Sequence, residues 1–548
     1  MDHRSEYERW LHKVQDAELL EELRGMTEAE IEDAFYRHLA FGTGGLRGTI
    51  GAGTNRMNIY VVARASLGLA HYIGRGGSVV IGYDSRLKSD VFARTAACVF
   101  AAAGVKAYIW PELLPVPTVS YAVRQLKASA GVMITASHNP AQYNGYKVYG
   151  PDGCQITTDS AAVILREINR LDLFADACAI PFEAGIRDGS IAYIDDSVLT
   201  AYLQEIREQS VLYGDAVDRN VAIVYTPLNG TGLKPVTRAL REAGFQNITV
   251  VEEQRNPDGH FPTCPYPNPE IREAMELGLK TCARVNADLL MVTDPDCDRC
   301  GIAVRGEDGA YELLTGNEVG LLLLDYICAQ RIKHGKMPAH PIFVKTVVTT
   351  DLAEKIAAHY GVETVNVLTG FKYIGEVIGR LENEEDYICG FEESYGYLTG
   401  SYVRDKDGVN AAFMIAEMFA FYKTRGVSLT EKLAGIYRSY GYCLNTLHTY
   451  SFPGSAGMEK MSEIMAAFHR RLAMIGGERV LGTEDFSLGL YGLPKSDVLK
   501  FRLENSSVVV RPSGTEPKLK TYISVTANDR QQAEAIEKRL AADLEKRF

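Results

Sequence analysis

A serine and a histidine, Ser137 and His138, stand where an apolar stretch of the sequence gives way to small and polar residues. The stretch reads as a buried strand, and Pro140 cannot continue a strand ladder, so the hydroxyl lies at the end of a rigid element. An Asn-Gly pair at 144–145 favours a turn, and the cationic Lys147 follows it. A serine held at a strand end near a cation can carry covalent chemistry. A polar turn between two strands would give the same short pattern, and the pattern alone does not separate the two.

Three aspartates follow a second apolar stretch at alternate positions. Asp294, Asp296 and Asp298 would project to the same face of an extended chain. Three carboxylates so close together repel each other unless a cation neutralises them, and hard oxygen ligands favour Mg²⁺ or Ca²⁺. A calcium EF-hand begins with the same spacing, but it requires glycine where Arg299 stands and glutamate where Arg305 stands. The pattern therefore predicts a magnesium site with open positions for water or a phosphate oxygen, with a solvated acidic turn as the alternative.

A basic loop rich in hydroxyls lies between two apolar stretches near the C-terminus. Arg511 offers a bidentate guanidinium, and Ser513 and Thr515 offer hydroxyls. Gly514 frees backbone N–H groups, and Lys520 follows on the next apolar stretch. These groups could cradle a dianionic phosphate, although a basic hairpin loop explains the segment equally well when it is taken alone.

Adjacent carboxylates and a hydroxyl, Glu392, Glu393 and Ser394, end another apolar stretch. Such groups suit vicinal sugar hydroxyls, which both donate and accept hydrogen bonds. A solvated acidic turn is again the alternative. A glycosidase pair is disfavoured, because neighbouring residues usually point apart whereas glycosidases need two carboxylates facing each other across ~5–9.5 Å.

The composition is that of an ordinary globular protein of several domains. The chain has 548 residues, of which 46% are hydrophobic and 23% charged, and single cores rarely grow past ~250–300 residues. A net charge of −12 argues against nucleic acid or an anionic membrane surface as the main partner. The apolar runs are too short to span a bilayer, and the charged N-terminus does not read as a secretory signal. The 10 cysteines have no framework spacing, so we expect reduced thiols and a cytoplasmic protein.

Helical and strand-like segments alternate along most of the chain. The N-terminal segment has apolar residues at helical spacing, and a glycine-rich loop at 41–48 then presents Arg47. A strand, a helix and a second strand follow between 78 and 110, which is the order of an α/β sheet. Ligands collect at the carboxyl ends of strands in such sheets, where Ser137 and Arg86 are expected.

Two further units repeat this order, and the last unit differs from them. Three consecutive units of similar order suggest a diverged internal repeat. Strands at 506–510 and 519–525, followed by a helix, fit a small α+β domain instead. We therefore expect an α/β protein with three similar mixed α/β domains and a C-terminal α+β domain. The expected domains are 1–205 with the N-terminal helices and Ser137, 206–310 with the aspartates, 311–440 with the adjacent glutamates, and 441–548 with the basic loop.

Taken together, the four motifs resemble the α-D-phosphohexomutase superfamily, which comprises phosphoglucomutases, phosphomannomutases and their relatives. The resemblance covers nearly the whole chain and implies four domains around a central cleft. The sugar loop, Phe-Glu-Glu-Ser-Tyr-Gly, and the N-terminal helices look most like the long phosphoglucomutase/phosphopentomutase branch, rather than the Gly-Glu-x-Ser-Gly-His form of phosphomannomutase-type relatives. The motifs keep the family's order, with 135–140 as the phosphoserine loop, 294–299 as the metal loop, 392–394 as the sugar loop and 511–515 as the phosphate loop.

The resemblance implies an intramolecular phosphotransferase that works through a phosphoserine and a bisphosphate. It would interconvert glucose 1-phosphate and glucose 6-phosphate with Mg²⁺ as cofactor and glucose 1,6-bisphosphate as intermediate and activator. The implied partner is a small sugar phosphate, bound by a monomer or weak homodimer. The implied catalytic residues are Ser137, His138, Lys147 and Arg47, and the implied metal ligands are Ser137, Asp294, Asp296 and Asp298. The implied substrate-binding residues are Arg299, Gly370, Lys372, Glu392, Ser394, Arg511, Ser513, Gly514, Thr515 and Lys520.

Several functions stay open at this point. Phosphopentomutase, phosphomannomutase and glucose 1,6-bisphosphate synthase would use the same scaffold, and rates on the 1-phosphates of glucose, ribose and mannose would separate them. A non-catalytic protein that binds sugar phosphate or calcium is a different class, and the intact Ser137, Lys147 and aspartates argue against it. A metal-dependent hydrolase is a third class, and it predicts release of free phosphate at the rate of turnover.

Overall fold

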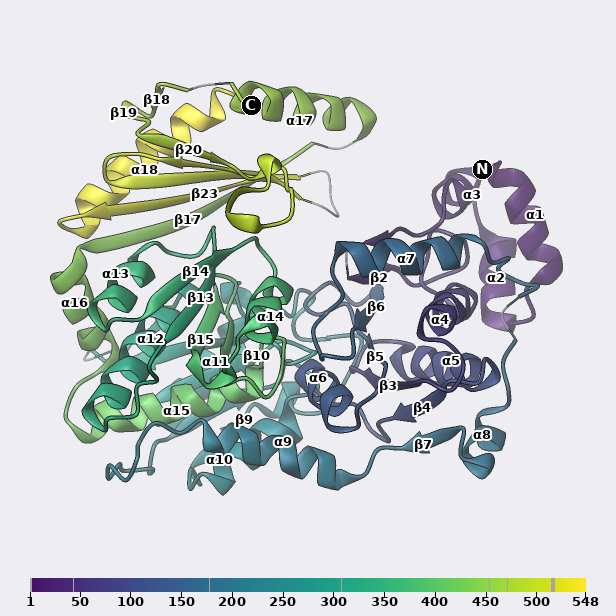
Figure 1. Cartoon of the computed structure of the whole chain (residues 1–548), viewed down its shortest axis with the longest axis horizontal. Coiled ribbons are helices and arrows are strands. Elements are labelled where there is room, and N and C mark those ends of the chain that lie inside the picture. The colour runs from purple at the N-terminus through teal and green to yellow at the C-terminus, as the bar shows by residue number, and fades with distance from the viewer. Residues whose placement is uncertain are drawn as a thin grey trace.

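The computed structural model describes residues 2–42, 44–176, 178–306, 308–452, 454–470, 472–513 and 518–548, without the side chains of 454–456. The described residues form four successive units, here called units 1 to 4 in chain order (Figure 1). Unit 1 lies on the right of Figure 1, unit 4 at the upper left, and units 2 and 3 beneath unit 4. The predicted fold class, three mixed α/β domains followed by an α+β domain, is confirmed.

Unit 1 carries a mixed sheet with helices on both faces. Its strands are β1 (Phe41–Gly42), β2 (Gly45–Thr49), β3 (Ser78–Tyr83), β4 (Lys106–Ile109), β5 (Ala130–Ile134), β6 (Tyr143–Tyr149) and β7 (Ile191–Tyr193), in the order β1-β2-β6-β5-β3-β4-β7. Its helices are α1 (His3–Lys13), α2 (Ala17–Gly25), α3 (Glu28–Phe35), α4 (Ile59–Ile73), α5 (Ser89–Ala102), α6 (Val116–Gln125), α7 (Thr158–Asn169) and α8 (Phe182–Asp188). Alternate residues of β3 point to opposite faces, so Val79 and Ile81 join a core with α4, α5 and the N-terminal helices. Val80 enters a core that continues into units 2 and 3.

Two local predictions in unit 1 are wrong. The Asn-Gly pair at 144–145 is not a turn but lies within β6, and Arg47 lies on the strand β2 rather than in a loop. Asn144 can remain in a buried strand because its amide donates to Leu87 O and Ser89 Oγ, each at 3.0 Å. Gly145 is needed because β6 packs closely against its neighbours there, and an added Cβ would lie 2.5 Å from Thr135 O. Gly145 therefore allows close packing of the strands and does not form a turn.

Unit 2 is a smaller version of the same design. Its elements are β8 (Ile223–Thr226), α10 (Leu233–Glu242), β9 (Ile248–Val250), the 3₁₀ turn η1 (Glu252–Gln254), α11 (Arg272–Val285), β10 (Leu289–Thr293), β11 (Cys300–Arg305) and β12 (Tyr311–Leu314). The sheet order is β12-β11-β10-β8-β9, with β10 parallel to β8 and antiparallel to β11. The sheet is therefore mixed, as in unit 1.

Unit 3 repeats the pattern around the order β14-β13-β15-β16. Its elements are α12 (Gly316–Lys333), β13 (Ile342–Thr346), α13 (Leu352–His359), β14 (Glu363–Val367), α14 (Phe371–Arg380), η2 (Glu384–Asp386), β15 (Tyr387–Glu392), β16 (Gly396–Thr399), α15 (Gly408–Thr424) and α16 (Leu429–Tyr440). β15 is parallel to β13 and antiparallel to β16. Units 2 and 3 share one continuous apolar core with the α6 face of unit 1, so the three sheets are fixed relative to each other.

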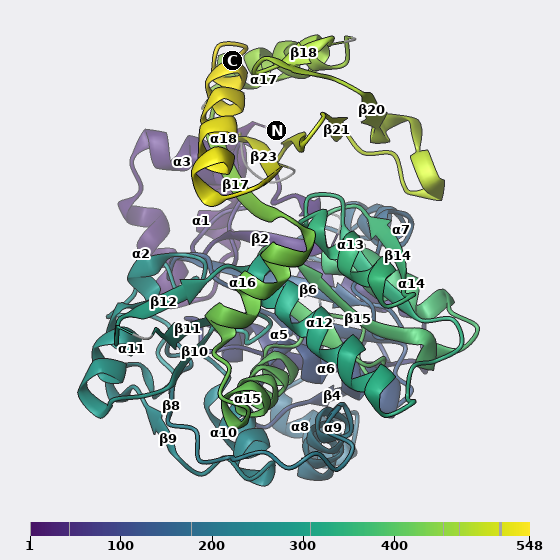
Figure 2. The same ribbon diagram turned by 90° about the vertical axis from the view of Figure 1, so that its left-hand side faces the viewer.

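Unit 4 is an antiparallel sheet with helices, and α16 leads into it (Figure 2). Its elements are β17 (Tyr442–Ser451), α17 (Gly454–Phe468), β18 (Met474–Ile475), β19 (Glu478–Arg479), β20 (Gly482–Asp485), η3 (Phe486–Leu488), η4 (Leu490–Gly492), β21 (Leu499–Arg502), β22 (Ser506–Pro512), β23 (Lys518–Ala527) and α18 (Arg530–Glu545). The main sheet order is β17-β23-β22-β21-β20. Lys500 and Ser507 anchor it on unit 3, because both bond to Asp351 at 2.6 and 2.9 Å.

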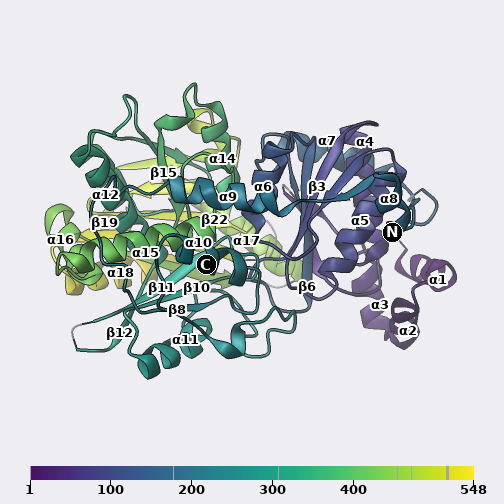
Figure 3. The same ribbon diagram turned by 90° about the horizontal axis from the view of Figure 1, so that it is seen from below.

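The helix α9 (Asp196–Glu208) packs on α6, α10 and α15, so it bridges units 1, 2 and 3 (Figure 3). The exact domain boundaries stay a prediction. All ten cysteines are free thiols. Within the residues that the structure describes, no helix is both long and apolar enough to cross a membrane.

Candidate active site

The candidate loops of units 1, 2 and 3 occupy the same place in their sheets. Each connects a buried strand that has a parallel neighbour to the antiparallel strand that follows it: β5 to β6, β10 to β11, and β15 to β16. Ser137, Asp294 and Glu392 therefore lie at or just beyond the carboxyl ends of equivalent strands. Ligands of α/β proteins bind at such ends. The repeat thus brings three sets of polar side chains toward one region.

Ser137 is buried and has a left-handed backbone conformation, with φ at 51°. Such a conformation costs a non-glycine residue about 1–3 kcal/mol, and it persists only where the surroundings enforce it. Here the backbone N–H donates to Thr135 Oγ1 at 2.8 Å. The hydroxyl donates to Asp294 Oδ2 at 2.9 Å and lies 3.2 Å from His138 Nδ1. The seryl oxygen is therefore held against a carboxylate of another unit.

Arg86 fixes the serine loop through its backbone carbonyls. Nη1 donates to Pro140 O at 2.9 Å, and Nη2 donates to the carbonyls of Ser137 and Asn139. Asp84 Oδ2 lies 3.4 Å from Arg86 Nε, and both side chains are fully buried. A buried guanidinium is tolerated when acceptors and a counter-charge surround it. Arg86 was predicted near this strand end, and in the structure its hydrogen bonds hold the loop in place.

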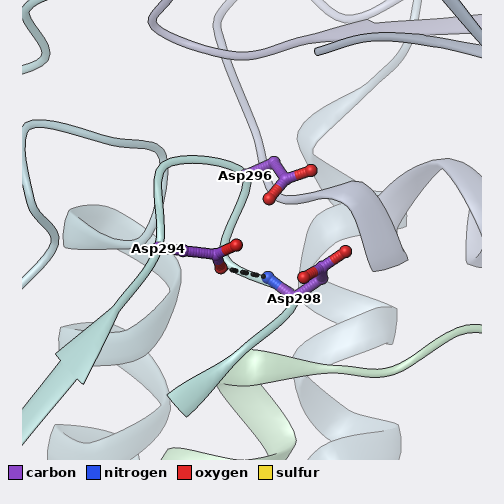
Figure 4. A group of neighbouring side chains, drawn as sticks. All are labelled: Asp294, Asp296 and Asp298. Atoms are coloured by element: carbon purple, nitrogen blue, oxygen red, sulfur yellow. Dashed lines mark hydrogen bonds between the residues drawn. The ribbon is translucent and has the colours of Figure 1, made fainter. Parts of the chain in front are cut away.

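The three aspartates converge on a small region (Figure 4). Asp294, Asp296 and Asp298 each offer an oxygen within 4.8 Å of the other two, and all three side chains are buried. The Asp298 N–H donates to Asp294 Oδ1 at 3.1 Å, which closes the loop on itself. Asp296 Oδ1 and Asp298 Oδ1 are buried, and neither has a hydrogen-bond partner in the part of the chain that the structure describes. Burial and the charges of the other two aspartates raise the pKa of Asp294 well above its ordinary value.

This donor set fits a hard divalent cation. It consists of carboxylate oxygens in a compact, buried arrangement, and two of those oxygens have no hydrogen-bond partner among the described residues. An uncompensated group of buried carboxylates is costly, and a cation would remove that cost. Ser137 Oγ, close to Asp294, supplies a fourth oxygen at the edge of the group. These four residues could hold a magnesium ion.

Two lysines carry part of the opposing charge. Lys147 Nζ lies 3.0 Å from Asp296 Oδ2 and 3.4 Å from Asp298 Oδ2, and Lys406 Nζ lies 2.9 Å from Asp298 Oδ2. Burial acts to lower the pKa of each lysine, but the neighbouring carboxylates outweigh it and both pKa values are raised. Both side chains are therefore ammonium ions facing the aspartates.

Lys406 and Thr135 contact the aspartates, and neither contact was predicted from the sequence. Thr135 Oγ1 donates to Asp296 Oδ2 at 3.1 Å, which ties the serine loop to the metal loop. Thr135 lies inside the serine motif, but nothing in its type indicates an aspartate partner. A signal for Lys406 was available in the sequence, because four charged residues, Arg404-Asp405-Lys406-Asp407, directly precede the apolar helix α15. Charges beside the start of a buried helix need partners of opposite charge.

Arg299 joins the metal loop to a residue that was not predicted. Its Nη1 pairs with Glu270, while its Nε lies 3.8 Å from Asp298 Oδ1 and 4.0 Å from Asp294 Oδ2. Its side chain is 14% exposed. Arg299 thus lies between two groups of carboxylates.

The sugar loop adjoins the same cations. Glu392 Oε1 accepts a hydrogen bond of 2.9 Å from the Gly370 N–H, and Ser394 lies half-buried in the turn between β15 and β16. Burial raises the pKa of Glu392, although the charges of Lys406 and Arg299 oppose that rise. The positive charge of Lys406 therefore lies close to carboxylates of both the metal loop and the sugar loop.

The described residues of the phosphate motif in unit 4 include Arg511, which lies toward unit 3. Arg511 and Lys520 stand opposite each other on β22 and β23. Burial raises the pKa values of Tyr373 and Tyr522, and the charge of Arg511 opposes both rises, so Arg511 lies near both phenols. Tyr373 follows Lys372, whose own pKa burial lowers. Arg511 is thus close to the first turn of α14.

The remaining predicted residues are placed as follows. Arg47 Nη1 donates to Asn139 Oδ1 at 3.0 Å, beside the serine loop. The Ser513 N–H donates to Lys518 O at 2.7 Å. Gly514 and Thr515 lie outside the described residues. The structure therefore brings together the serine, metal and sugar loops, and it places Arg511 of unit 4 near unit 3.

The chain was compared with known families, proteins and structures. Models of the four domains of one family match in order: "Phosphoglucomutase/phosphomannomutase, alpha/beta/alpha domain I" at 38–174, domain II at 200–308, domain III at 315–440, and the C-terminal domain at 456–543. A phosphoglucomutase from Staphylococcus saprophyticus is 34% identical over 533 residues, which is 94% of this chain and 96% of the relative.

Solved structures share the fold. The Paramecium phosphoprotein pp63/parafusin, a phosphoglucomutase in an open form, has a TM-score of 0.70 at 16% identity and covers 93% of this chain and 94% of its own. An N-acetylphosphoglucosamine mutase from Aspergillus fumigatus, in complex with GlcNAc-6P and magnesium, has a TM-score of 0.53 at 14% identity and covers 93% of this chain and 96% of its own.

Proposed function

The chain belongs to the family of phosphoglucomutases and phosphomannomutases, and from that premise we propose that it is a phosphoglucomutase, an isomerase that interconverts glucose 1-phosphate and glucose 6-phosphate. One observation carries the proposal: Ser137 Oγ lies 2.9 Å from an oxygen of the buried aspartate group. Transfer through a phosphoserine requires a hydroxyl held beside a site for positive charge. Relatives named phosphoglucomutase support glucose over mannose as the sugar.

The proposed reaction begins with the phosphoryl group on Ser137. A free hydroxyl oxygen of the sugar monophosphate forms a bond to phosphorus, the bond from phosphorus to Oγ breaks, and the hydroxyl proton passes to the enzyme. The bisphosphate then reorients, and its other phosphoryl group returns to Oγ by the reverse exchange. Glucose 1,6-bisphosphate is therefore both the intermediate and the activator, since it can transfer a phosphoryl group to an unphosphorylated Ser137.

Asp294, Asp296 and Asp298, with Ser137, are the proposed ligands of magnesium. A bound magnesium ion would supply positive charge to the phosphoryl oxygens during transfer. Lys147 and Arg47 are the proposed groups for proton transfer and charge stabilisation near Ser137, with His138 in support. The position of Lys147 Nζ, within 3.4 Å of two of the aspartates, supports that role.

The other loops are proposed to hold the substrate. Glu392 and Ser394 would bond to the sugar hydroxyls in both orientations, since carboxylates and hydroxyls can accept from several ring positions. Gly370 and Lys372 would read the orientation of the sugar. The phosphate that is not reacting would lie on the basic loop, for which a guanidinium fork and hydroxyls are well suited. The groups proposed there are Arg511, Ser513, Gly514, Thr515 and Lys520, and Arg299 is proposed to contact substrate from the metal loop.

The binding partner, the oligomeric state and the cellular location of the protein are proposals as well. We propose a sugar phosphate as the partner, a monomer or weak homodimer as the assembly, and the cytoplasm as the location. Free thiols at all ten cysteines support a reducing compartment.

A substrate panel tests the proposed function. Turnover should be fastest on glucose 1-phosphate with Mg²⁺ and a trace of glucose 1,6-bisphosphate, and slower on mannose 1-phosphate and ribose 1-phosphate. Free phosphate should not appear at the rate of turnover. A strong preference for the pentose would assign a phosphopentomutase instead, and stoichiometric release of phosphate would assign a hydrolase.

A further inference from the structure

The guanidinium of Arg299 is held at one terminal nitrogen, and its Nε edge donates no hydrogen bond among the described residues. Nη1 pairs with Glu270, whereas Nε is buried and has no hydrogen-bond partner in the described part of the chain. A guanidinium is a planar fork with fixed angles between its donors, so holding one terminal nitrogen orients the remaining edge. The open edge is the one that contains Nε.

The open edge faces the reacting group. Nε lies 3.8 Å from Asp298 Oδ1 and 4.0 Å from Asp294 Oδ2, and the second of these oxygens accepts the hydrogen bond from Ser137 Oγ at 2.9 Å. A phosphoryl group on Ser137 would add oxygens beside this edge. Transfer of a phosphoryl group spreads negative charge over its three outer oxygens, and a correctly placed guanidinium stabilises that charge.

Glu270 is supplied by a stiff segment rather than a flexible one. It follows a proline-rich run, 265–269, and its N–H donates to Asn268 Oδ1 at 3.1 Å. Pro269 packs on β11 next to Arg299, since a Cβ added at Gly301 would lie 2.9 Å from Pro269 Cβ. The carboxylate is therefore anchored to the strand that directly follows its partner.

The surroundings of Glu270 favour a role in the site over a role in folding. Its side chain is 28% exposed, so it lies at the border of the site and not in the apolar core. It also lines a cavity of about 170 Å³ between units 3 and 4, together with Glu393 and Tyr395 of the sugar-loop turn. Glu270 thus borders the space next to the proposed substrate groups.

We propose that Glu270 is a positioning residue for phosphoryl transfer: by holding Nη1 of Arg299, it turns the Nε edge of the guanidinium toward the phosphoryl group on Ser137. This inference rests on the proposed function. Glu270 exchanges no proton and touches no reacting atom. It acts through Arg299, while the bond from phosphorus to Oγ breaks and the bond to the sugar oxygen forms.

The test is a double-mutant cycle on the full-length protein with Glu270→Gln and Arg299→Lys. Glu270→Gln should lower kcat roughly 10–100-fold, as expected for a catalytic group displaced by about 1 Å, with KM changed less than about threefold. In the Arg299→Lys background the same change should alter kcat less than about threefold, because the fork it orients is gone. Glu270→Asp, which keeps the charge, should recover part of the loss.

Two further measurements separate positioning from structure. Glu484→Gln removes a carboxylate that pairs with Arg502 in unit 4, and it should leave kcat near the wild-type value. In the metal-free phosphoenzyme, Glu270→Gln should shift the ³¹P resonance of the phosphoserine, and Glu484→Gln should not. A kcat of Glu270→Gln within threefold of wild type, or an equal loss in the Arg299→Lys background, would overturn the inference. Failure of the wild type to isomerise any sugar phosphate would overturn the proposed function itself, and the inference with it.

Discussion

Ser137 Oγ and Asp294 Oδ2 lie 2.9 Å apart, although 157 residues separate them in the sequence. The serine ends a strand of unit 1, and the aspartate ends the equivalent strand of unit 2. Their contact depends on the continuous core that joins the first three units. The candidate site is therefore a property of the assembled chain and not of any one unit.

Ser137→Ala should abolish mutase turnover and leave the fold intact. The change removes the nucleophile from a strand end and no volume from the core, so the loss of stability should be about 1–2 kcal/mol, the value of its hydrogen bonds. Turnover and thermal unfolding of the same sample measure the two effects. Ser190→Ala, at a half-buried serine whose hydroxyl donates to the nearby Asp188, is the matched control and should retain full turnover. Near-normal turnover in Ser137→Ala would rule out the covalent mechanism.

Removal of divalent cations should stop turnover, and Mg²⁺ should restore it. A ligand that binds only the folded state stabilises it, by about 2.7 kcal/mol at a hundredfold excess over its dissociation constant, so Mg²⁺ should raise the melting temperature of the wild type. Asp296→Asn should remove most of that rise, because Asp296 Oδ1 is one of the two unpartnered oxygens. The Mg²⁺-dependent shift is read by calorimetry. An equal shift in the wild type and in Asp296→Asn would place the ion elsewhere.

Arg511→Ala should weaken substrate binding more than metal binding. Its guanidinium is assigned to the non-reacting phosphate, and loss of a charge-assisted bond to phosphate should raise KM by roughly tenfold or more, corresponding to about 1.5–3 kcal/mol. Kinetics and Mg²⁺ titration of the same variant give the two affinities. Arg502→Ala, at an exposed arginine on the adjacent strand β21, is the control. Equal losses of substrate and metal affinity would contradict the assigned role.

The sequence was sufficient to predict the site loops because each one follows a strand that is buried and apolar. Asp294, Asp296 and Asp298 alternate directly after such a strand, and the structure places them within one small region. Ser137 was predicted at a strand end for the same reason. These predictions depend on local pattern, which a single sequence carries in full.

Contacts between residues far apart in the sequence could not be read from local pattern. Lys406 reaches Asp298 from unit 3, and Glu270 reaches Arg299 across unit 2, so neither pairing has a fixed spacing in the sequence. The error at Gly145 has a related cause. Glycine permits a turn and also permits close packing of strands, and only the neighbouring strand decides which use applies.

His469 should make the stability of unit 4 depend on pH. Its Nδ1 and Nε2 lie 2.9 Å from Asp485 Oδ2 and from Asp497 Oδ1, and both nitrogens can donate only in the protonated ring. Burial acts to lower the pKa of His469, but Asp497 and Asp485 outweigh it and the pKa is raised. A raised folded-state pKa gives stability that is fully present below the ordinary value of about 6.5 and is lost as pH rises through the folded value.

His469→Gln should therefore reduce the stability of unit 4 at about pH 6 and have little effect at about pH 9, where the wild-type ring is neutral. The side chain is 31% exposed, so the effect should be small and should shrink further in salt. Hydrogen exchange of β20 and α17 at the two pH values measures it. His340→Gln, at an exposed loop histidine, is the control. A destabilisation that is the same at both pH values would show that the ion pairs do not depend on protonation.

Gly145→Ala should weaken both the fold of unit 1 and the activity. The added Cβ would lie 2.5 Å from Thr135 O and 2.8 Å from Leu46 O, which are backbone atoms of the strands on either side and cannot move independently. Overpacking of this kind costs about 1–3 kcal/mol. Displacement of Thr135 should also reach the serine loop, because its hydroxyl accepts the Ser137 N–H. Gly25→Ala is the matched control, since outside its own helix backbone and chain neighbours no described atom lies within 4 Å of its added Cβ at the end of α2. Thermal unfolding and turnover should both fall in Gly145→Ala and stay near wild type in Gly25→Ala. Unchanged unfolding in Gly145→Ala would mean that β2, β5 and β6 can separate at this point without cost.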